Sequence, residues 1–441
     1  MGWKHTFKMA ILKPGYRAMR AVSPSLADRL RGRIYAVAAR MKGDSTALFV
    51  RAEPWERTAP ALLADLTETT RVDAGTGIQR VVNNIFQELS AAREDVLPVR
   101  NQDGRLITSR KYLARCKGEP FDGKERQVDF LPGDRLLLLD SSWLTVETFQ
   151  RIFKEAHEKG IALYNVVYDL LPIQHPEWLN NDFYEASFSQ WQDCALQYGK
   201  GILCISRTTA DAVADYFAKK AIRRDSPLEL HYFHMGAKLP KVQDGEAREE
   251  IRRFVEGGTT FLMVGTVEVR KGHAMACRAL RKLLEQREAR LLIIGRNGWQ
   301  NEEFKQLLQQ DAALREHVLW VEDASDVELH WAYRHAAALI AASIDEGFGL
   351  PLVEAAYFGV PILCSDIPIF REVAQGYADY FKVMDEDDLA AKLSAWMDAS
   401  EHPDSRRIRI YTWKEAAGEI LEILEGKREP YRVLGEASVP C

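Results

Sequence analysis

Two glutamates, Glu346 and Glu354, bracket a turn that contains two glycines and a proline, within the run 344–354. An apolar stretch at 338–342 leads into this turn, and Pro351 suits the first position of a following helix. The glycines let a ligand approach the backbone, and the amides of a helix N-terminus favour phosphate groups. The two carboxylates can accept hydrogen bonds from sugar and ribose hydroxyl groups. The run therefore predicts a sugar-diphosphate site; the alternative is an ordinary turn with surface acids.

A second loop carries two adjacent cations. The run 264–273 follows an apolar stretch and precedes a helical pattern, and it holds Arg270 and Lys271. Such side chains at the carboxyl end of a strand are placed to neutralise phosphates. The alternative is a solvated basic turn, and the position at a strand end favours the phosphate site.

Two further features lie in the first half of the chain. The glycine-rich run 75–80 opens a helix and predicts a loop that admits an acceptor or a phosphate. It lacks the third glycine of a dinucleotide fingerprint, which argues against NAD. Asp169 follows the apolar stretch 161–167, where a parallel sheet presents polar catalytic groups. The alternative for Asp169 is a carboxylate that caps its own loop.

These residues require strands that end, and helices that begin, at one edge of a sheet. Apolar stretches alternate with helical patterns in both halves of the chain, which predicts an α/β fold with parallel sheets covered on both faces. The predicted strands are 136–139, 161–167, 201–205, 259–264, 291–294, 318–321, 338–342 and 361–364. The predicted helices are 81–89, 145–159, 208–219, 272–286, 326–335 and 351–358.

This alternation predicts two doubly wound, Rossmann-like domains that face each other across a cleft. The charged stretch 241–256 lacks apolar periodicity before Ile251 and is the predicted linker. We divide the chain into a basic N-terminal segment (1–62), a first domain (63–240), a second domain (241–410) and a C-terminal helix that returns to the first domain, with a tail (411–441).

Composition bounds the class of protein. The 441 residues are 46% apolar and 28% charged, as in soluble globular proteins, and the net charge of −5 gives no overall bias toward nucleic acid. No apolar stretch reaches the roughly 18 residues that indicate a membrane-spanning helix. The six scattered cysteines lack zinc-ligand spacing, and we expect reduced thiols in a cytoplasmic protein.

The charge is concentrated at the N-terminus: residues 1–42 carry +9 and the remainder −14. Residues 25–41 predict a basic amphipathic helix, because apolar residues recur at helical spacing and arginines flank them. Such a helix can lie on an acidic membrane surface. It can also dock on the first domain with its arginines toward solvent. We favour the membrane interpretation.

Together these motifs resemble family 4 of the retaining glycosyltransferases, which have the GT-B fold, and especially bacterial mannosyl- and rhamnosyltransferases that build surface polysaccharides. Glu346 and Glu354 reproduce the family's E-x7-E pattern. The resemblance extends over about residues 64–427 and also rests on the runs 75–80, 231–237, 265–271, 291–299 and 411–414.

The resemblance implies a role for each group. The catalytic residues are Glu346, which holds the transferred sugar, Lys271, which stabilises the leaving diphosphate, and Asp169, which orients or deprotonates the acceptor hydroxyl; Glu354 holds the ribose. The implied donor-binding set is Gly265, Thr266, Arg270, Gly295, Trp299, Gly347, Phe348, Gly349, Leu350 and Glu354. The implied acceptor set is Gly75, Thr76, Gly77, Arg80, Tyr168 and His175.

The chain departs from the family pattern at several positions. Many members have a histidine at the position of Tyr168, and His175 lies too far along the chain to replace it on sequence alone. Thr266 stands where many members have arginine, and Lys238 where aspartate is common. These departures concern the acceptor side more than the donor side.

The resemblance implies transfer of a hexose, with mannose favoured, from a nucleotide diphosphate sugar, GDP-mannose above all. The implied acceptor is a saccharide on polyprenyl diphosphate, for an O-antigen, capsule or exopolysaccharide. We expect no cofactor and no metal, no nucleic-acid partner, and a cytoplasmic enzyme held at the inner membrane through residues 1–42. The alternatives are a UDP-sugar-dependent transferase, a GT-B sugar-nucleotide epimerase and a non-catalytic sugar-binding module.

Overall fold

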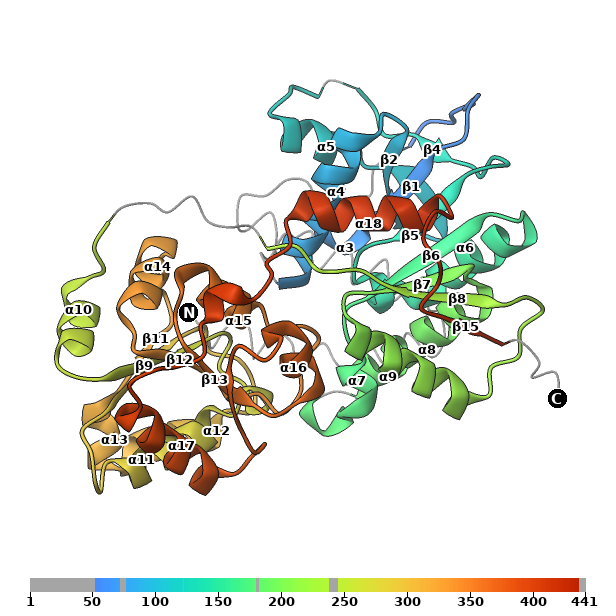
Figure 1. Ribbon diagram of the computed structural model, residues 1–441. Helices are drawn as coiled ribbons and strands as arrows, with labels where there is room; N and C mark the ends of the chain where they lie inside the picture. The colour runs from blue at the N-terminus through green and yellow to red at the C-terminus, as the bar shows by residue number, and fades with distance from the viewer. Residues whose placement is uncertain (1–51, 72–76, 122, 180–181, 238–244, 436–441) are drawn as a thin grey trace.

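A computed structural model describes residues 52–71, 77–121, 123–179, 182–237 and 245–435. It consists of two α/β units, each with one sheet and helices on both of its faces (Figure 1). The predicted fold class is therefore confirmed. The amphipathic helix predicted for 25–41 and the loop residues Gly75 and Thr76 lie outside the described residues.

The second unit is built on six parallel strands in the order β11-β10-β9-β12-β13-β14. The strand order reverses between β9 and β12, which are neighbours in the sheet. In open α/β sheets, ligands bind outside the carboxyl ends of the strands at such a reversal. The strands are β9 (Thr260–Val264), β10 (Arg290–Ile294), β11 (Val318–Val321), β12 (Ala338–Ala341), β13 (Ile362–Ser365) and β14 (Asp379–Phe381).

The first unit has nine strands in the order β15-β8-β7-β6-β5-β1-β2-β3-β4. The strands from β8 to β2 run parallel, and β15, β3 and β4 pair antiparallel at the two edges. The strands are β1 (Leu62–Asp65), β2 (Val96–Gln102), β3 (Arg105–Thr108), β4 (Gln127–Val128), β5 (Arg135–Leu138), β6 (Ala162–Val167), β7 (Gly201–Cys204), β8 (Leu228–Tyr232) and β15 (Arg432–Leu434).

The central strands are buried on both faces, which explains their continuous apolar runs. Leu136 to Leu138 in β5 and Leu292 in β10 are fully inaccessible to solvent. Each such leucine contributes about 1.5–3 kcal/mol through burial. The principal helices that cover the sheets are α4 (Gly77–Ala92), α6 (Val146–Glu158), α8 (Asp182–Tyr198), α9 (Arg207–Lys220), α11 (His273–Leu283), α14 (Asp326–His335), α15 (Leu350–Phe358), α16 (Pro368–Ala374) and α17 (Glu386–Asp398).

The last helix, α18 (Trp413–Leu424), crosses back and packs on α4 of the first unit (Figure 1). A reciprocal capping pair of Thr412 and Glu415 fixes its start, because each side chain bonds the other residue's backbone amide. Its apolar face, with Ile420 and Leu424, joins the core formed by α4 and the sheet. The chain before α18 therefore passes from the second unit back to the first.

The predicted strands and helices of the second unit all occur, with ends that shift by three residues or fewer. The predicted linker is partly wrong, because residues 249–256 form helix α10 (Glu249–Glu256). Ile251 and Val255, one turn apart, are its buried residues. Two apolar residues are too short a pattern to reveal a helix in a charged stretch.

In the part of the chain that the structure describes, no helix is long and apolar enough to cross a bilayer.

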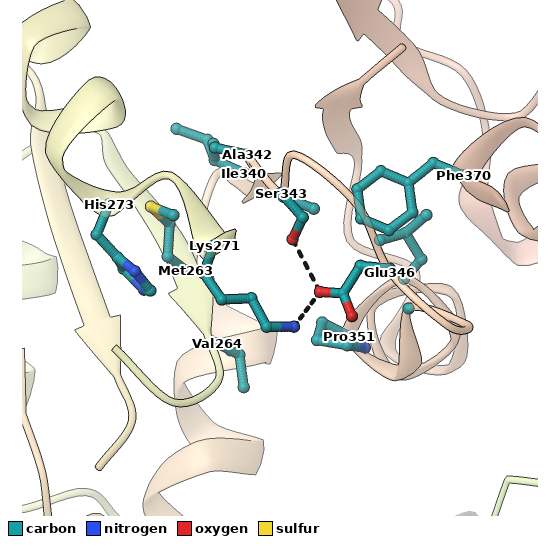
Figure 2. Close-up of a pocket in the computed structure, with 13 residues that line it drawn as sticks. Met263, Val264, Lys271, His273, Ile340, Ala342, Ser343, Glu346, Pro351 and Phe370 are labelled. Atoms are coloured by element: carbon teal, nitrogen blue, oxygen red, sulfur yellow. Dashed lines mark hydrogen bonds and ion pairs between the residues drawn. The ribbon is translucent and has the colours of Figure 1, made fainter. Parts of the chain in front are cut away.

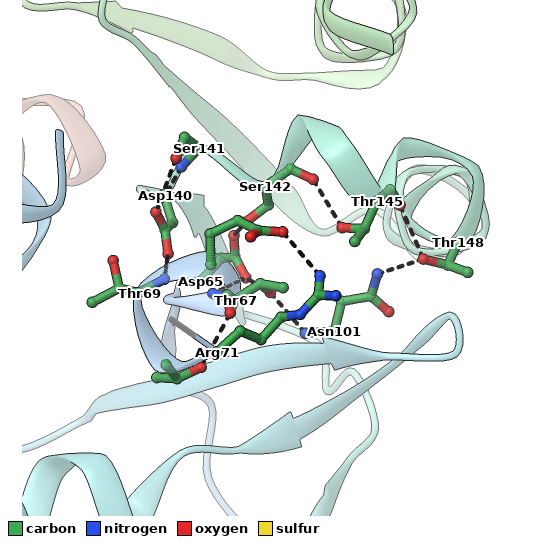
Figure 3. A network of polar contacts seen from close by, with 12 residues as sticks. Asp65, Thr67, Thr69, Arg71, Asn101, Asp140, Ser141, Ser142, Thr145 and Thr148 are labelled. Atoms are coloured by element: carbon green, nitrogen blue, oxygen red, sulfur yellow. Dashed lines mark hydrogen bonds and ion pairs between the residues drawn. The ribbon is translucent and has the colours of Figure 1, made fainter. Parts of the chain in front are cut away.

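The first sheet reverses its order between β1 and β5, and two buried carboxylates stand at that point (Figure 3). Asp65 ends β1 and accepts hydrogen bonds from Ser142 Oγ (2.5 Å) and from both the amide and the hydroxyl of Thr67. Asp140 follows β5 and accepts one from the Thr69 amide (2.6 Å). Together they fix helix α3 (Thr67–Arg71), which precedes the glycine-rich loop.

Burial raises the pKa of Asp65 to about 8, with the charge of Asp140 adding to the effect. The folded protein thus holds this proton up to about pH 8, whereas an unfolded chain releases it near the ordinary value of 3.8. Unfolding between these values releases a proton, so the free energy of unfolding falls as pH rises through this window.

We predict that Asp65→Asn, which mimics the protonated carboxyl, flattens this pH dependence. Between pH 5 and 8 the wild type loses up to about 1.4 kcal/mol of stability per pH unit from this group, and the variant does not. Urea unfolding at four pH values measures the slope, with the exposed Asp215→Asn as control. Equal slopes in wild type and Asp65→Asn would show that Asp65 is ionised in the fold.

Candidate active site

The two loops that carry the predicted chemistry meet at the reversal point of the second sheet. Lys271 follows β9 and Glu346 follows β12, and these strands are adjacent. A backbone hydrogen bond from the Ile344 amide to the Arg270 carbonyl (2.8 Å) joins the loops. The fold therefore brings together two segments about 75 residues apart in sequence.

A buried group of charges occupies this point (Figure 2). The Glu346 carboxylate forms ion pairs with Arg270 (2.7 Å) and Lys271, and it accepts a hydrogen bond from Ser343 Oγ (2.9 Å). Arg270 also pairs with the buried Glu268 through Nε (2.6 Å). Two cations, with side chains 23% and 14% exposed, thus balance two carboxylates that are 8% and 2% exposed. We call Glu268, Arg270, Lys271 and Glu346 the charge cluster.

The charge cluster keeps Glu346 ionised. Burial acts to raise the pKa of this carboxyl, but the positive charges of Arg270 and Lys271 outweigh burial and lower the pKa to about 2. A carboxylate with so low a pKa cannot donate a proton near neutral pH. It can hold hydroxyl groups and stabilise positive charge that develops beside it.

The turn after Glu346 leads directly into helix α15. Gly349 has φ +97°, a left-handed conformation that favours glycine, and Pro351 lies in the first turn of the helix. The residue at the start of the helix is this glycine, so no side chain occupies the N-terminus of α15, where the partial positive charge of the helix favours an anion. A small cavity lies here, lined among others by Lys271, Ser343, Glu346 and Gly349 (Figure 2).

Glu354 lies in α15 and does not line this cavity. Its carboxylate is buried and accepts a hydrogen bond from the Tyr333 hydroxyl (2.7 Å). Burial raises its pKa, although Tyr333, Arg80 and Lys271 act in the opposite direction. Lys271 and Arg80 are therefore close enough to act electrostatically on the Glu354 carboxyl.

Of the residues predicted in the first unit, Asp169 and His175 approach this point, whereas the Tyr168 side chain does not. Asp169 accepts a hydrogen bond from the Leu171 amide (3.1 Å), and burial raises its pKa to about 6 against the opposing charge of Arg270. The Tyr168 hydroxyl instead donates to the Leu139 carbonyl (2.6 Å) in the core. His175 Nε2 lies 3.4 Å from Asp345, the residue before Glu346. His175 therefore reaches the site despite its place in the sequence.

Of the ten residues in the implied donor set, Gly349 lines the cavity and the other nine do not. Gly295 packs so closely on the Gly265 carbonyl that a side chain would collide with it. Thr266 contacts the neighbouring Gly298. Trp299 is 49% exposed, and its Nε1 donates to the Trp178 carbonyl (3.1 Å) of the first unit.

Phe348 and Leu350 face the first unit. Phe348 packs against the cores of both units, and Leu350 packs against the core of the first. The turn that carries Glu346 is thus held from both sides.

Of the implied acceptor set, Gly77 is the first residue of helix α4.

Sequence reasoning missed the partners of the predicted residues. Ser343 and Asp345 follow a strand directly and were open to the argument used for Glu346, whereas Glu268 stood in the basic loop without a role. Tyr333 lies on α14, and its contact with Glu354 depends on tertiary packing that no local pattern encodes.

Among the described residues, no group of three or more His, Cys, Asp or Glu side chains could hold a metal ion.

Two facing α/β units with a ligand site at the reversal of the second sheet define the GT-B glycosyltransferase fold. The crystal structure of Anabaena Alr3699/HepE in complex with UDP and glucose aligns with a TM-score of 0.58 at 13% identity, over 83% of this chain and 100% of that one. Sucrose-phosphate synthase from Thermosynechococcus elongatus aligns with a TM-score of 0.56 at 14% identity, over 84% and 99%. These similarities concern the fold.

Residues 245–427 match the family described as Glycosyl transferases group 1, and the chain belongs to that family. It is 31% identical to the serotype-specific mannosyltransferase WbdA of Escherichia coli over 382 residues, which is 82% of this chain and 46% of WbdA. It is 27% identical to the O-antigen chain mannosyltransferase RfbU of Salmonella typhimurium, over 54% and 61% of the two chains. The chain spans about half the length of the WbdA proteins.

We predict opposite effects on nucleotide binding for two variants of the charge cluster. Glu346→Gln removes a charge that competes with phosphate for Arg270 and Lys271, so GDP affinity stays equal or rises while transfer falls by about 10²-fold or more. Lys271→Ala lowers both. Calorimetric titration of GDP and initial rates measure the two quantities. Weaker GDP binding by Glu346→Gln than by the wild type would contradict the assignment of Arg270 and Lys271 as phosphate-binding residues for which Glu346 competes.

Proposed function

We propose that the protein is a retaining mannosyltransferase that uses GDP-mannose and extends a lipid-linked saccharide in surface polysaccharide synthesis. The observation that carries the proposal is the charge cluster at the start of α15, because it offers two cations to a diphosphate beside an ionised carboxylate, at the positive end of a helix. The names of WbdA and RfbU support mannose as the transferred sugar.

The diphosphate is the leaving group of this reaction. The bond between the sugar C1 and the β-phosphate oxygen breaks, and its electron pair moves to that oxygen. Lys271, Arg270 and the amides that open α15 then stabilise the added negative charge. Lys271 and Arg270 already form ion pairs with Glu346. A small shift of their end groups therefore lets them contact phosphate oxygens in place of the Glu346 carboxylate.

Glu346 serves the other half of the charge separation. The sugar gains oxocarbenium character as the bond breaks, and a carboxylate with a pKa of about 2 remains negative beside it. The acceptor oxygen attacks the face that the diphosphate leaves, which retains the anomeric configuration. Glu354, on the helix that follows Glu346, holds the ribose hydroxyl groups.

Asp169 is the proposed proton acceptor for the attacking hydroxyl group. It comes from the first unit and lies against Gly347, the residue after Glu346, because a Cβ atom on that glycine would lie 3.2 Å from the Asp169 Cβ. A pKa of about 6 lets the carboxylate take a proton near neutral pH. With phosphate charge met by Lys271 and Arg270, the proposed mechanism needs no metal ion.

The acceptor and the location follow from the polysaccharide assignment. O-antigen mannosyltransferases such as RfbU support a growing saccharide as acceptor, and we propose that polyprenyl diphosphate carries it. The basic segment 1–42 then holds the enzyme at the acidic inner face of the membrane.

We predict that GDP raises the thermal unfolding midpoint more than UDP or dTDP at equal concentration, because only the cognate nucleotide binds the native form tightly.

With GDP-mannose and a synthetic lipid-linked mannoside, NMR should show a product that keeps the donor's anomeric configuration, at rates unchanged by EDTA. Product formed without acceptor would indicate an epimerase, and nucleotide binding with no reaction a binding module. Inverted product or loss of activity with EDTA would contradict the mechanism.

A further inference from the structure

A carboxylate of the second unit caps a helix of the first. Glu372, on α16, accepts hydrogen bonds from the amides of Arg207 and Thr208 (both 2.8 Å) and from Thr208 Oγ1 (2.6 Å). Arg207 and Thr208 are the first two residues of α9. The two helices lie against each other across the boundary of the units (Figure 1).

The start of α9 depends on this contact. The first amides of a helix have no partner within it. In α9 the Thr209 amide is satisfied by the N-cap residue Ser206 (3.0 Å), but the two amides before it are satisfied by Glu372. A negative charge at a helix N-terminus is also favoured by the helix dipole.

The same end of α9 holds the turn that carries Glu346. The hydroxyl groups of Ser206 and Thr209 lie 3.3 Å and 3.4 Å from the Gly347 carbonyl oxygen and can donate to it. Gly347 itself fits here because it has no side chain: a Cβ atom would lie 2.4 Å from the Tyr168 carbonyl. The position of Gly347, and so of its neighbour Glu346, is therefore set from the first unit.

We propose that Glu372 is a positioning residue for the transfer reaction: its contact with α9 holds the two units together and fixes the turn at Glu346 for catalysis. This inference rests on the proposed function. The proposed donor contacts, namely Lys271, Arg270, Glu346 and Glu354, all lie in the second unit. Loss of the Glu372 contact should therefore leave nucleotide binding intact and slow the step that needs both units.

The test uses the full-length chain and compares Glu372→Ala with the exposed Glu256→Ala of the same unit as control. We expect Glu372→Ala to lower kcat about tenfold, the scale of a lost charge-assisted contact, with the dissociation constant of GDP unchanged within about twofold. Hydrogen exchange at the amides of residues 207 and 208 should accelerate, while Glu256→Ala matches the wild type in all three measurements.

A variant from the other side of the contact separates positioning from general instability. Thr208→Val removes one donor to Glu372 and should lower kcat in the same direction, and the double variant should lose less than the product of the two single losses. Full additivity, or wild-type kcat and exchange in Glu372→Ala, would overturn the inference. Because exchange is measured without substrate, it reports on the contact even if the wild type transfers no mannose, the result that would overturn the proposed function.

Discussion

The ion pairs of Glu346 with Arg270 and Lys271 are the interaction on which the site depends. Removing two cations and a carboxylate from water is costly, and it is tolerated only because each charge has a partner at hydrogen-bond distance. Glu268 completes the balance through Arg270. Such a cluster is poised for a ligand with opposite charges at its two ends, since a diphosphate satisfies the cations and an electron-poor sugar satisfies the carboxylate.

The rest of the fold serves to place this cluster. The strand order of the second sheet brings the ends of β9 and β12 together, and the left-handed Gly349 lets the turn after Glu346 pass directly into α15. The first unit adds Asp169 and His175 from one loop and the start of α9 from another. The proposed catalytic arrangement is thus shared between the two units.

Much of this could be predicted from the sequence because buried parallel strands have continuous apolar runs and polar groups follow them directly. That logic found Lys271, Glu346 and Asp169. It could not find the His175–Asp345 contact or the capping of α9 by Glu372, since these depend on how two units pack. It also missed helix α10, whose two buried residues give too weak a period, and the short strands β3 and β4 near the edge of the first sheet.

A crystal structure of the protein with GDP-mannose, or with a non-transferable analogue, tests the central claim most directly. The account predicts that Lys271 and Arg270 contact the diphosphate at the start of α15 while Glu346 faces the sugar. It would be contradicted by a diphosphate bound elsewhere, with Glu346 still paired to both cations.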